Sequence, residues 1–493
     1  MHLRFSTLLP AALCGWLFFI SSAQAQLTEQ WRVDIPNNAY YTYWGFDAEG
    51  NAYGMQAVWE SPRYTFHLHK VSADGVLEWS IQDTPDLFNS FAIRENWPFW
   101  VDLAGNSYIV GNAWMDTVDG GGWPCIVKYS PSGTRLYQRV AQPPGCVGGV
   151  GSNVGHVAAW AVDSLGQIFA AGTLESTAGG VYHSYGYAMM LSSEAAKISE
   201  SFFSPQNLGG EIISYNINGP RGPDKNGNYM FAYHEWIYNT PDDDIYIYHF
   251  AGIDCNAAIR WQASSPPIQD GERYWNLANF RMYQSGNIYS HGLAYTVEKF
   301  SPEFVLQWTK TYNTYYPPIA RAENPYDESV LIYEDGVTDP LACYNADGTL
   351  RWRLNIAAPS YWQTVFGPEH DIYTVVKSGT PATLVRIDYQ TGEIVWQGNV
   401  ELGSAYLGVA SKMRVDVDGE ITFAANDRVV HFSQEKLLTI RDAHHDSLPN
   451  VTFDLIRVAN NPPYFDDDTL GSFTTDSEGR LSLTSIGLDS FFV

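Results

Sequence analysis

One short pattern recurs along this chain of 493 residues and limits its fold more than any other feature. It reads Asp-x-x-Gly-Asn-x-Tyr at residues 47–53 and returns at residues 102–108. A period of about 40–60 residues made of strands and tight turns is typical of small sheets arranged radially, as in a β-propeller. Related turns follow around Gly166, Gly227, Gly286, Gly419 and Gly479.

A second signal accompanies the first: a tight turn followed by a strand that carries tryptophan. Residues 347–352 (Asp-Gly-Thr-Leu-Arg-Trp) and 391–396 (Thr-Gly-Glu-Ile-Val-Trp) show it most clearly. Apolar residues alternate along these segments, as they do at residues 245–248, and this period of two indicates strands. We find no convincing amphipathic helix after the N-terminal segment.

The repeats predict an all-β fold, a β-propeller of four-stranded antiparallel blades. Units with four strands begin near residues 40, 91, 156, 213, 276, 319, 363 and 412. Residues 29–35 resemble an isolated fourth strand, and residues 453–493 resemble the first three strands of one more blade. We therefore expect eight or nine blades, with the ring closed by pairing of N- and C-terminal strands, which removes two open sheet edges.

Tryptophans on the outer strands recur at one register, which indicates packing between blades. A packing residue must repeat with the architecture, whereas a binding residue is expected to be unique. A large aromatic side chain suits the wedge between neighbouring blades because it buries much area. The set is Trp79, Trp261, Trp308, Trp352 and Trp396.

The segment at residues 387–396, Ile-Asp-Tyr-Gln-Thr-Gly-Glu-Ile-Val-Trp, resembles the tryptophan-docking repeat of PQQ-like β-propellers. The Asp-x-x-Gly-Asn-x-Tyr copies resemble related short repeats of secreted bacterial proteins. The resemblance implies a PQQ-like fold, a family that includes quinoprotein dehydrogenases. However, none of the five cysteines neighbours another, unlike the adjacent pair of the quinoprotein alcohol dehydrogenases, and their calcium-binding set matches no motif here. We therefore predict no bound cofactor, with PQQ and calcium lacking support from any motif.

The N-terminus reads as a secretory signal peptide at residues 1–25. Arg4 precedes an apolar run, and Ala23-Gln24-Ala25 is a cleavage site of small residues. The mature chain would then begin at Gln26, and we expect residues 26–493 to form a single propeller domain. We expect this domain to be secreted or periplasmic, and we find no further segment long and apolar enough to span a membrane. That compartment permits a disulfide between Cys125 and Cys146.

The formal net charge of −26 repels nucleic acid and anionic lipid, so we expect neither as a partner. The simplest interpretation of this charge is solubility, and we expect a monomer. Acidic triplets and adjacent histidines are present, but no spacing predicts a metal site. Carbohydrate or another protein is the expected partner.

A binding site is expected at the central mouth, on the connections that lead from one blade to the next. These connections carry aromatic and amide side chains, which suit sugars; alternatively, the aromatic side chains simply fill the channel. Arginines on first strands could hold an anionic ligand, or could pair internally with repeat aspartates. The candidate residues are Tyr41, Trp44, Trp97, Trp275, Tyr316, Trp362, Arg281 and Arg414.

The functional prediction is a propeller that binds a ligand or partner and is not an enzyme, because repeats cover the chain and no catalytic constellation is recognisable. Two alternatives stay open. One is a PQQ-dependent oxidoreductase, which rests on the repeat resemblance alone. The other is a carbohydrate-active hydrolase or lyase, because 54 acidic residues make carboxylate pairs inevitable.

Overall fold

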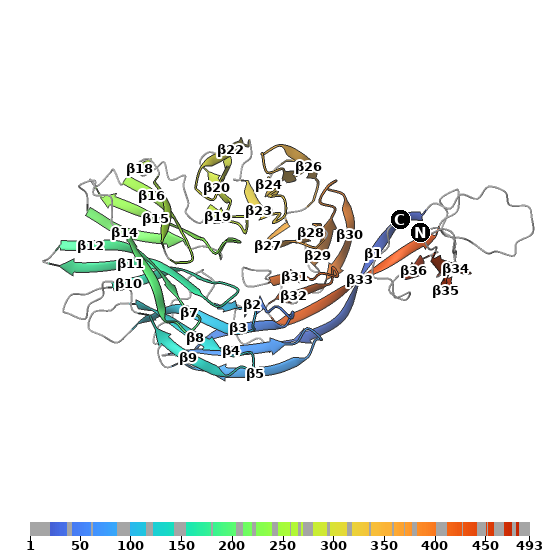
Figure 1. The fold of residues 1–493 in the computed structure, drawn as a ribbon, viewed down its shortest axis with the longest axis horizontal. Coiled ribbons are helices and arrows are strands. Elements are labelled where there is room, and N and C mark those ends of the chain that lie inside the picture. The colour runs from blue at the N-terminus through green and yellow to red at the C-terminus, as the bar shows by residue number, and fades with distance from the viewer. Residues whose placement is uncertain are drawn as a thin grey trace, which may run out of the picture.

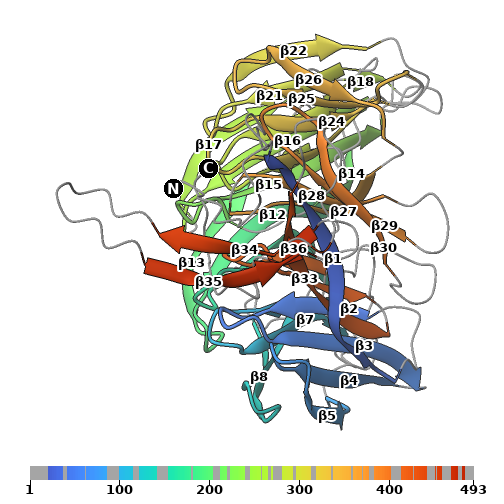
Figure 2. The same ribbon diagram turned by 90° about the vertical axis from the view of Figure 1, so that its right-hand side faces the viewer.

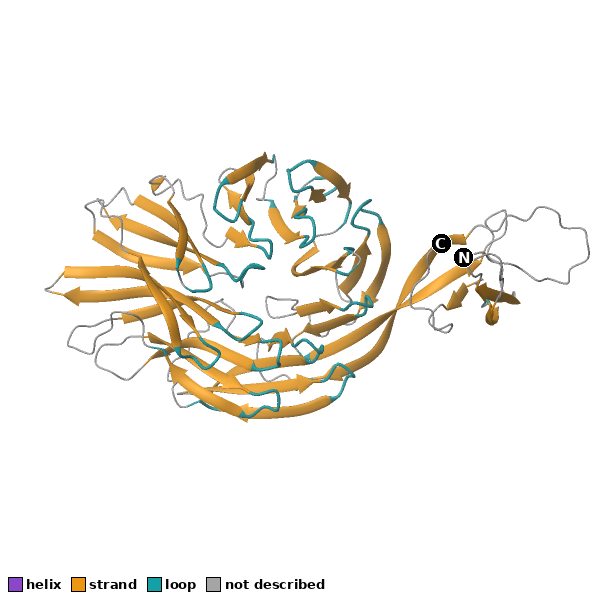
Figure 3. Cartoon of the chain, in the orientation of Figure 1, coloured by secondary structure: helices purple, strands orange, loops and turns teal. Residues whose placement is uncertain are grey.

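Strands joined by turns and loops make up the whole of the described structure, and its described residues include no helix (Figure 3). This confirms the predicted all-β fold. The computed structural model describes residues 20–36, 42–60, 63–85, 99–114, 122–141, 154–178, 181–203, 211–218, 223–238, 245–256, 258–264, 268–269, 280–292, 296–312, 318–334, 337–356, 359–368, 370–376, 382–400, 412–425, 427–440, 450, 452–457, 468–475 and 480–482.

Eight four-stranded antiparallel blades are arranged around a central axis (Figure 1), and seven of them are continuous in sequence. Blade 1 contains β2 (Thr42–Phe46), β3 (Ala52–Glu60), β4 (Arg63–Val71) and β5 (Leu77–Asp83). Blade 2 contains β6 (Phe99–Val101), β7 (Ser107–Trp114), β8 (Gly122–Tyr129) and β9 (Arg135–Val140). Blade 3 contains β10 (Val154–Val162), β11 (Ile168–Ala178), β12 (Val181–Leu191) and β13 (Lys197–Phe203).

The next four blades follow the same order of strands. Blade 4 contains β14 (Glu211–Asn218), β15 (Tyr229–Tyr238), β16 (Ile245–Ile253) and β17 (Ile259–Ser264), with β18 (Ile268–Gln269) added beside β16. Blade 5 contains β19 (Phe280–Met282), β20 (Ile288–Gly292), β21 (Thr296–Phe300) and β22 (Leu306–Thr311). Blade 6 contains β23 (Ile319–Glu323), β24 (Val330–Tyr333), β25 (Leu341–Tyr344) and β26 (Leu350–Leu354). Blade 7 contains β27 (Pro359–Phe366), β28 (Ile372–Val376), β29 (Ala382–Ile387) and β30 (Ile394–Val400).

Blade 8 joins the two ends of the chain and closes the ring. Its first three strands are β31 (Lys412–Val415), β32 (Ile421–Ala425) and β33 (Arg428–Ile440), and its fourth is β1 (Ile20–Asp34). Trp31 of β1 lies opposite His431 of β33 in this pairing. The predicted closure by N- and C-terminal strands is therefore confirmed, and the unit that begins at Lys412 takes its fourth strand from residues 20–34.

The nine-blade alternative is wrong, because residues 29–34 complete blade 8 and do not join residues 453–493. The C-terminal residues instead form a two-stranded sheet, β34 (Thr452–Arg457) with β35 (Asp468–Thr474). A short strand, β36 (Arg480–Ser482), pairs with the far half of β33. Figure 1 shows the β34–β35 pair to one side of the ring, and Figure 2 views it from that side.

The antiparallel order gives the ring two different ends. Connections from first to second strand and from third to fourth strand lie at one end, which we call the turn end. Connections from second to third strand, and from each blade to the next, lie at the other end, which we call the loop end. First strands of neighbouring blades contact one another near the axis, including β2 with β6 and β31 with β2, which joins the last blade to the first.

The outer-strand tryptophans dock on the next blade at the turn end. The indole N–H of Trp352 in blade 6 donates to the carbonyl oxygen of Tyr389 in blade 7 at 2.8 Å. Equivalent bonds from the other blades run from Trp79 to Pro131 (3.0 Å), from Trp261 to Pro302 (2.7 Å) and from Trp308 to Ala346 (3.1 Å). The prediction that these tryptophans pack between blades is confirmed for all four.

The turn that receives the indole requires a backbone that glycine adopts most easily. Gly392 has φ +75°, and a Cβ atom there would lie 2.5 Å from Cδ2 of Trp352. Glycine therefore serves twice at this position, because it accepts the left-handed backbone and leaves room for the ring. The N-terminal strand uses the same contact, since a Cβ on Gly75 of blade 1 would lie 2.5 Å from Cδ2 of Trp31.

Trp396 is the exception, because β33 and β1 of blade 8 come from opposite ends of the chain and no turn joins them. Its ring is buried and stands edge-on to Tyr373 of its own blade, with centroids 6.3 Å apart. The register is that of the other tryptophans, since Trp396 lies opposite Arg386 as Trp308 lies opposite Lys299. Its packing role is thus kept without a docking turn.

We predict that Trp352→Ala lowers the free energy of unfolding by about 3–5 kcal/mol, the usual loss for a buried large aromatic. Trp352→Phe should cost less, because it keeps most of the packing and loses mainly the hydrogen bond to Tyr389, which is worth about 1 kcal/mol. Equilibrium unfolding in guanidinium chloride measures both. An Ala variant as stable as the wild type would contradict the docking role.

Candidate functional site

The repeat turn uses its aspartate to hold two neighbours. In blade 1, Oδ2 of Asp47 accepts hydrogen bonds from the amide of Asn51 (2.8 Å) and the hydroxyl of Tyr53 (3.1 Å). Asp102 of blade 2 receives the same two bonds from Asn106 and Tyr108, at 2.9 and 3.0 Å. Because this arrangement repeats, we assign it to packing. A functional site should appear where the chain departs from it.

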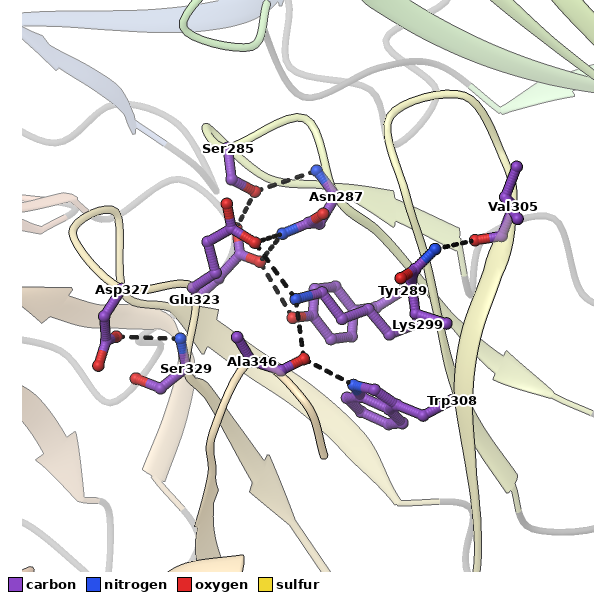
Figure 4. Close-up of polar contacts among 12 residues, drawn as sticks. Ser285, Asn287, Tyr289, Lys299, Val305, Trp308, Glu323, Asp327, Ser329 and Ala346 are labelled. Atoms are coloured by element: carbon purple, nitrogen blue, oxygen red, sulfur yellow. Dashed lines mark hydrogen bonds and ion pairs between the residues drawn. The ribbon is translucent and has the colours of Figure 1, made fainter. Parts of the chain in front are cut away.

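Blade 5 departs from the pattern because Tyr283 stands where the aspartate is expected. The carboxylate comes instead from Glu323, at the end of β23 in blade 6 (Figure 4). Its Oε1 accepts from the amide of Asn287 (2.9 Å) and the hydroxyl of Tyr289 (3.0 Å). Ser285 donates to its other oxygen. Glu323 thus accepts, across the interface of two blades, the two hydrogen bonds that Asp47 accepts within one blade.

A second carboxylate lies beside the first. The amide nitrogen of Asn287 also donates to Oε2 of Glu328, at 2.9 Å. Nζ of Lys299 lies 3.4 Å from the same oxygen and donates to the carbonyl of Ala346 at 3.2 Å. We call Glu323, Glu328, Asn287, Tyr289 and Lys299 the carboxylate cluster. It joins blade 5 to blade 6 at the turn end.

The two carboxylates of the cluster have pKa values moved in opposite directions. Burial raises the pKa of Glu323 to about 7, although three side chains donate to its oxygens. The hydrogen bond from Asn287, together with the nearby charge of Lys299, holds the pKa of Glu328 below its ordinary value. Near neutral pH, Glu323 therefore changes its charge while Glu328 stays ionised.

Blades 6 and 7 also replace the glycine of the repeat turn. Glu328 and His370 have φ of +60° and +67°, where Gly50, Gly105 and Gly419 have +92°, +81° and +81°. A left-handed backbone costs a residue with a Cβ roughly 1–2 kcal/mol. Both side chains reach back to the preceding blade, Glu328 to Asn287 and His370 to Tyr326.

The ring of His370 stacks on Tyr326, with centroids 4.0 Å apart and planes 10° apart. His370 also approaches Tyr389, whose ring lies 4.3 Å from the guanidinium of Arg351. Arg351 in turn bonds Asp327 at 2.9 Å, next to Tyr326 in sequence. We call Tyr326 and His370 the aromatic stack. It lies at the turn end of blades 6 and 7.

Most of the mouth residues predicted from the sequence are not described by the structure. Tyr41, Trp97, Trp275 and Tyr316 lie outside the described residues, and of Trp362 only the backbone in β27 is described. Trp44 is described, and it is a core residue with 1% of its surface exposed. Its ring covers Gly54, where a Cβ would lie 2.7 Å from Cζ3, so we assign Trp44 to packing and not to a ligand-binding mouth.

The two candidate arginines are both described. Arg281 is buried in β19, opposite the repeat tyrosine Tyr289. Arg414 of blade 8 donates to the carbonyl of Ala48 in blade 1 at 3.2 Å, and its guanidinium lies against Gly50. The guanidinium of Arg414 therefore contributes to ring closure, and its pairing is with a backbone carbonyl, not with a repeat aspartate.

Of the two cysteines predicted to pair, only Cys125 is described. It is fully buried in β8, and burial raises the pKa of its thiol to about 12. Cys146 lies outside the described residues, so the suggested disulfide stays a prediction. Among the described residues, no group of three or more His, Cys, Asp or Glu side chains is placed to hold a metal ion. Nor does the described part contain a helix long and apolar enough to cross a membrane.

No model of a known protein family matches the chain, and no curated protein matches its sequence. Solved structures resemble its fold at low identity. A eukaryotic initiation factor is 10% identical, with a TM-score of 0.38, over 74% of this chain and 79% of that one. A puromycin hydrolase is 13% identical, with a TM-score of 0.41, over 82% and 61%. An α-L-arabinanase of Penicillium chrysogenum complexed with arabinobiose is 9% identical, with a TM-score of 0.33, over 85% and 98%.

At such identities the likeness concerns the fold alone. The assignment of eight blades rests on the strand pairing of this chain itself. The finer resemblance to PQQ-like propellers stays a prediction.

We predict that Glu323 makes the stability of the protein depend on pH between about 4.5 and 7. The folded state raises the pKa of this carboxyl from 4.5 to about 7, so it binds the proton more tightly than the unfolded chain does. The resulting stabilisation is complete below pH 4.5 and is lost as the pH rises through 7. Glu323→Gln, which resembles the protonated acid, should remove this dependence.

Melting temperatures of wild type and Glu323→Gln at about pH 5, 6 and 7.5 test the effect, since these values span the titration of the carboxyl. The melting temperature of the wild type should fall relative to that of Glu323→Gln as the pH rises. Glu328→Gln is the matched control, because the depressed pKa of Glu328 gives a stabilisation that is lost as the pH falls. Parallel curves for wild type and Glu323→Gln would show that the carboxyl of Glu323 titrates normally.

Proposed function

We propose that this chain is a secreted or periplasmic propeller that binds a carbohydrate or another ligand at the loop end of the ring and does not transform it. The observation that carries this proposal is a difference between the turn end and the loop end of the ring. At the turn end, the repeat aspartates and the docking carbonyls are taken up by contacts within and between blades. Such groups are already satisfied and offer little to a ligand.

The loop end has a different character in sequence. The connection from blade 6 to blade 7 uses only residues 355–358, whereas the connection from blade 1 to blade 2 uses residues 84–98. Unequal loops on a regular scaffold are where proteins carry binding residues. Tyr41, Trp97, Trp275 and Tyr316 all fall in such connections, and aromatic faces with nearby amides suit the C–H faces and hydroxyls of sugars.

A glycan array probed with the mature protein from Gln26 tests the proposal. We expect binding to at least one carbohydrate class, weakened about tenfold or more in the double variant Trp97→Ala and Trp275→Ala, as is usual when aromatic anchors are lost. The docking variant Trp79→Phe is the matched control, because it changes an aromatic at the turn end of blade 1 and should bind as the wild type does. Absence of binding on the array, or equal binding by all variants, would contradict the proposed mouth.

A hydrolase is the second candidate, and the carboxylate cluster favours it. A carboxyl with raised pKa beside one with lowered pKa is the arrangement of a general acid with a base or nucleophile. We prefer the binding function because Glu323 is 7% exposed and its oxygens are taken up by Ser285, Asn287 and Tyr289. Release of reducing ends from a polysaccharide, abolished by Glu323→Gln or Glu328→Gln, would instead establish catalysis.

A further inference from the structure

Tyr326 differs from every other large apolar residue exposed on the described surface. It is 57% exposed, whereas the remaining exposed large hydrophobic side chains in the described part of the chain are all aliphatic. Most of the aliphatic ones recur in the repeat, either at the start of the outer strands, as at Leu306 and Leu350, or two residues before the turn glycine, as at Leu103 and Val417. Tyr326 also stands two residues before the left-handed residue of its turn, and among the described residues it is the one exposed aromatic at that position. An aromatic ring in place of the repeat aliphatic makes Tyr326 a candidate ligand contact.

His370 supports Tyr326 at a cost to the fold. Six repeat turns place glycine at the equivalent position, with positive φ, and His370 adopts φ +67° there. A left-handed backbone is less favourable for histidine, which carries a Cβ, than for glycine. Its ring stacks on one face of Tyr326 with centroids 4.0 Å apart, and Tyr326 remains 57% exposed. The strain is therefore associated with an oriented aromatic surface.

The segment that carries Tyr326 is fixed on its other side as well. Asp327 bonds Arg351 at 2.9 Å, and Arg351 also bonds the side-chain oxygen of Asn345 at 2.7 Å. The guanidinium of Arg351 lies over Tyr389, which in turn lies near His370. These contacts make a closed circuit around the interface of blades 6 and 7. A ring held in this way loses little conformational entropy when a ligand stacks on it.

We infer that the aromatic stack is a second binding site, at the turn end of blades 6 and 7, that takes one sugar ring of a carbohydrate ligand. The inference rests on the proposed binding function and adds a site at the opposite end of the ring. A sugar presents an apolar C–H face to an aromatic ring while its hydroxyls bond polar neighbours. Asp327, next to the stack, is a partly exposed carboxylate of the right kind.

The same chemistry argues against other ligands with flat faces. A nucleobase on a polynucleotide would bring phosphates to a chain with a net charge of −26. A docked polypeptide needs a broad apolar patch around its central aromatic. Around Tyr326 lie Asp327 and Glu328, both acidic, and the pair formed by Arg351 with Asp327. A single aromatic face with a polar surround fits a sugar better than a protein.

Binding of the array's strongest oligosaccharide, measured by isothermal titration calorimetry, tests the inference with four variants beside the wild type. Tyr326→Ala should weaken binding at the turn-end site about tenfold or more, and Tyr326→Trp should retain it, because an aromatic face carries the contact. His370→Gly should weaken binding while the melting temperature stays the same or rises, because the variant restores the repeat glycine and relieves strain. Leu350→Ala removes an exposed aliphatic from the same blade and should bind as the wild type does.

The outcomes separate this inference from the proposed function. Binding that survives Tyr326→Ala but is lost in the Trp97→Ala and Trp275→Ala variant would overturn the second site and leave the proposed function intact. Failure of the wild type to bind any carbohydrate would overturn both. If His370→Gly lowers the melting temperature and leaves binding unchanged, the stack is only packing. Binding of a polypeptide, and of no glycan, through Tyr326 would overturn the sugar assignment.

Discussion

An indole ring laid on the backbone turn of the next blade is the contact on which this ring of sheets depends. It joins a donor on the outermost strand of one blade to a carbonyl of the following blade, as from Trp352 to Tyr389. Each blade is too small to bury its own faces, so its stability comes from its neighbours. The ring of Trp31 on the N-terminal strand lies against the turn glycine Gly75 of blade 1. Arg414 adds a second link from blade 8 to blade 1. The chain ends are thereby part of the packing.

Changes to the aspartate or the glycine of the repeat turn are concentrated in three successive blades. In blade 5 a tyrosine takes the place of the repeat aspartate, and Glu323 of blade 6 supplies the missing carboxylate. In blades 6 and 7 the turn glycine gives way to Glu328 and His370, which reach back to the preceding blade. A repeat protein can tolerate such changes when a neighbour compensates. The compensation explains why a buried carboxyl with a raised pKa lies at this interface, and why the adjoining turn presents an aromatic ring to solvent.

The sequence was sufficient to predict the propeller architecture, but it was insufficient to predict the candidate site. Turn glycines and outer tryptophans repeat because every interface needs them, so their period predicts blades. The number of blades was ambiguous because residues 29–34 carry no information about which strand they pair with. Trp44 resembled a mouth residue, yet its ring covers Gly54, a contact across strands that no local pattern reveals. The partnership of Glu323 with Asn287 spans two blades and was missed, although Tyr283 in the place of aspartate was a usable sign.

The indole of Trp31 lies on Gly75 of blade 1 as the indole of Trp352 lies on Gly392, and we infer that this contact closes the ring. Hydrogen–deuterium exchange of wild type and Trp31→Ala, resolved by peptide, tests this closure most directly. We predict loss of protection in the turn at residues 72–76 of blade 1 and in residues 428–434 of blade 8, on both sides of the closing interface. Protection unchanged at these two segments would show that the ring is closed by something other than this tryptophan.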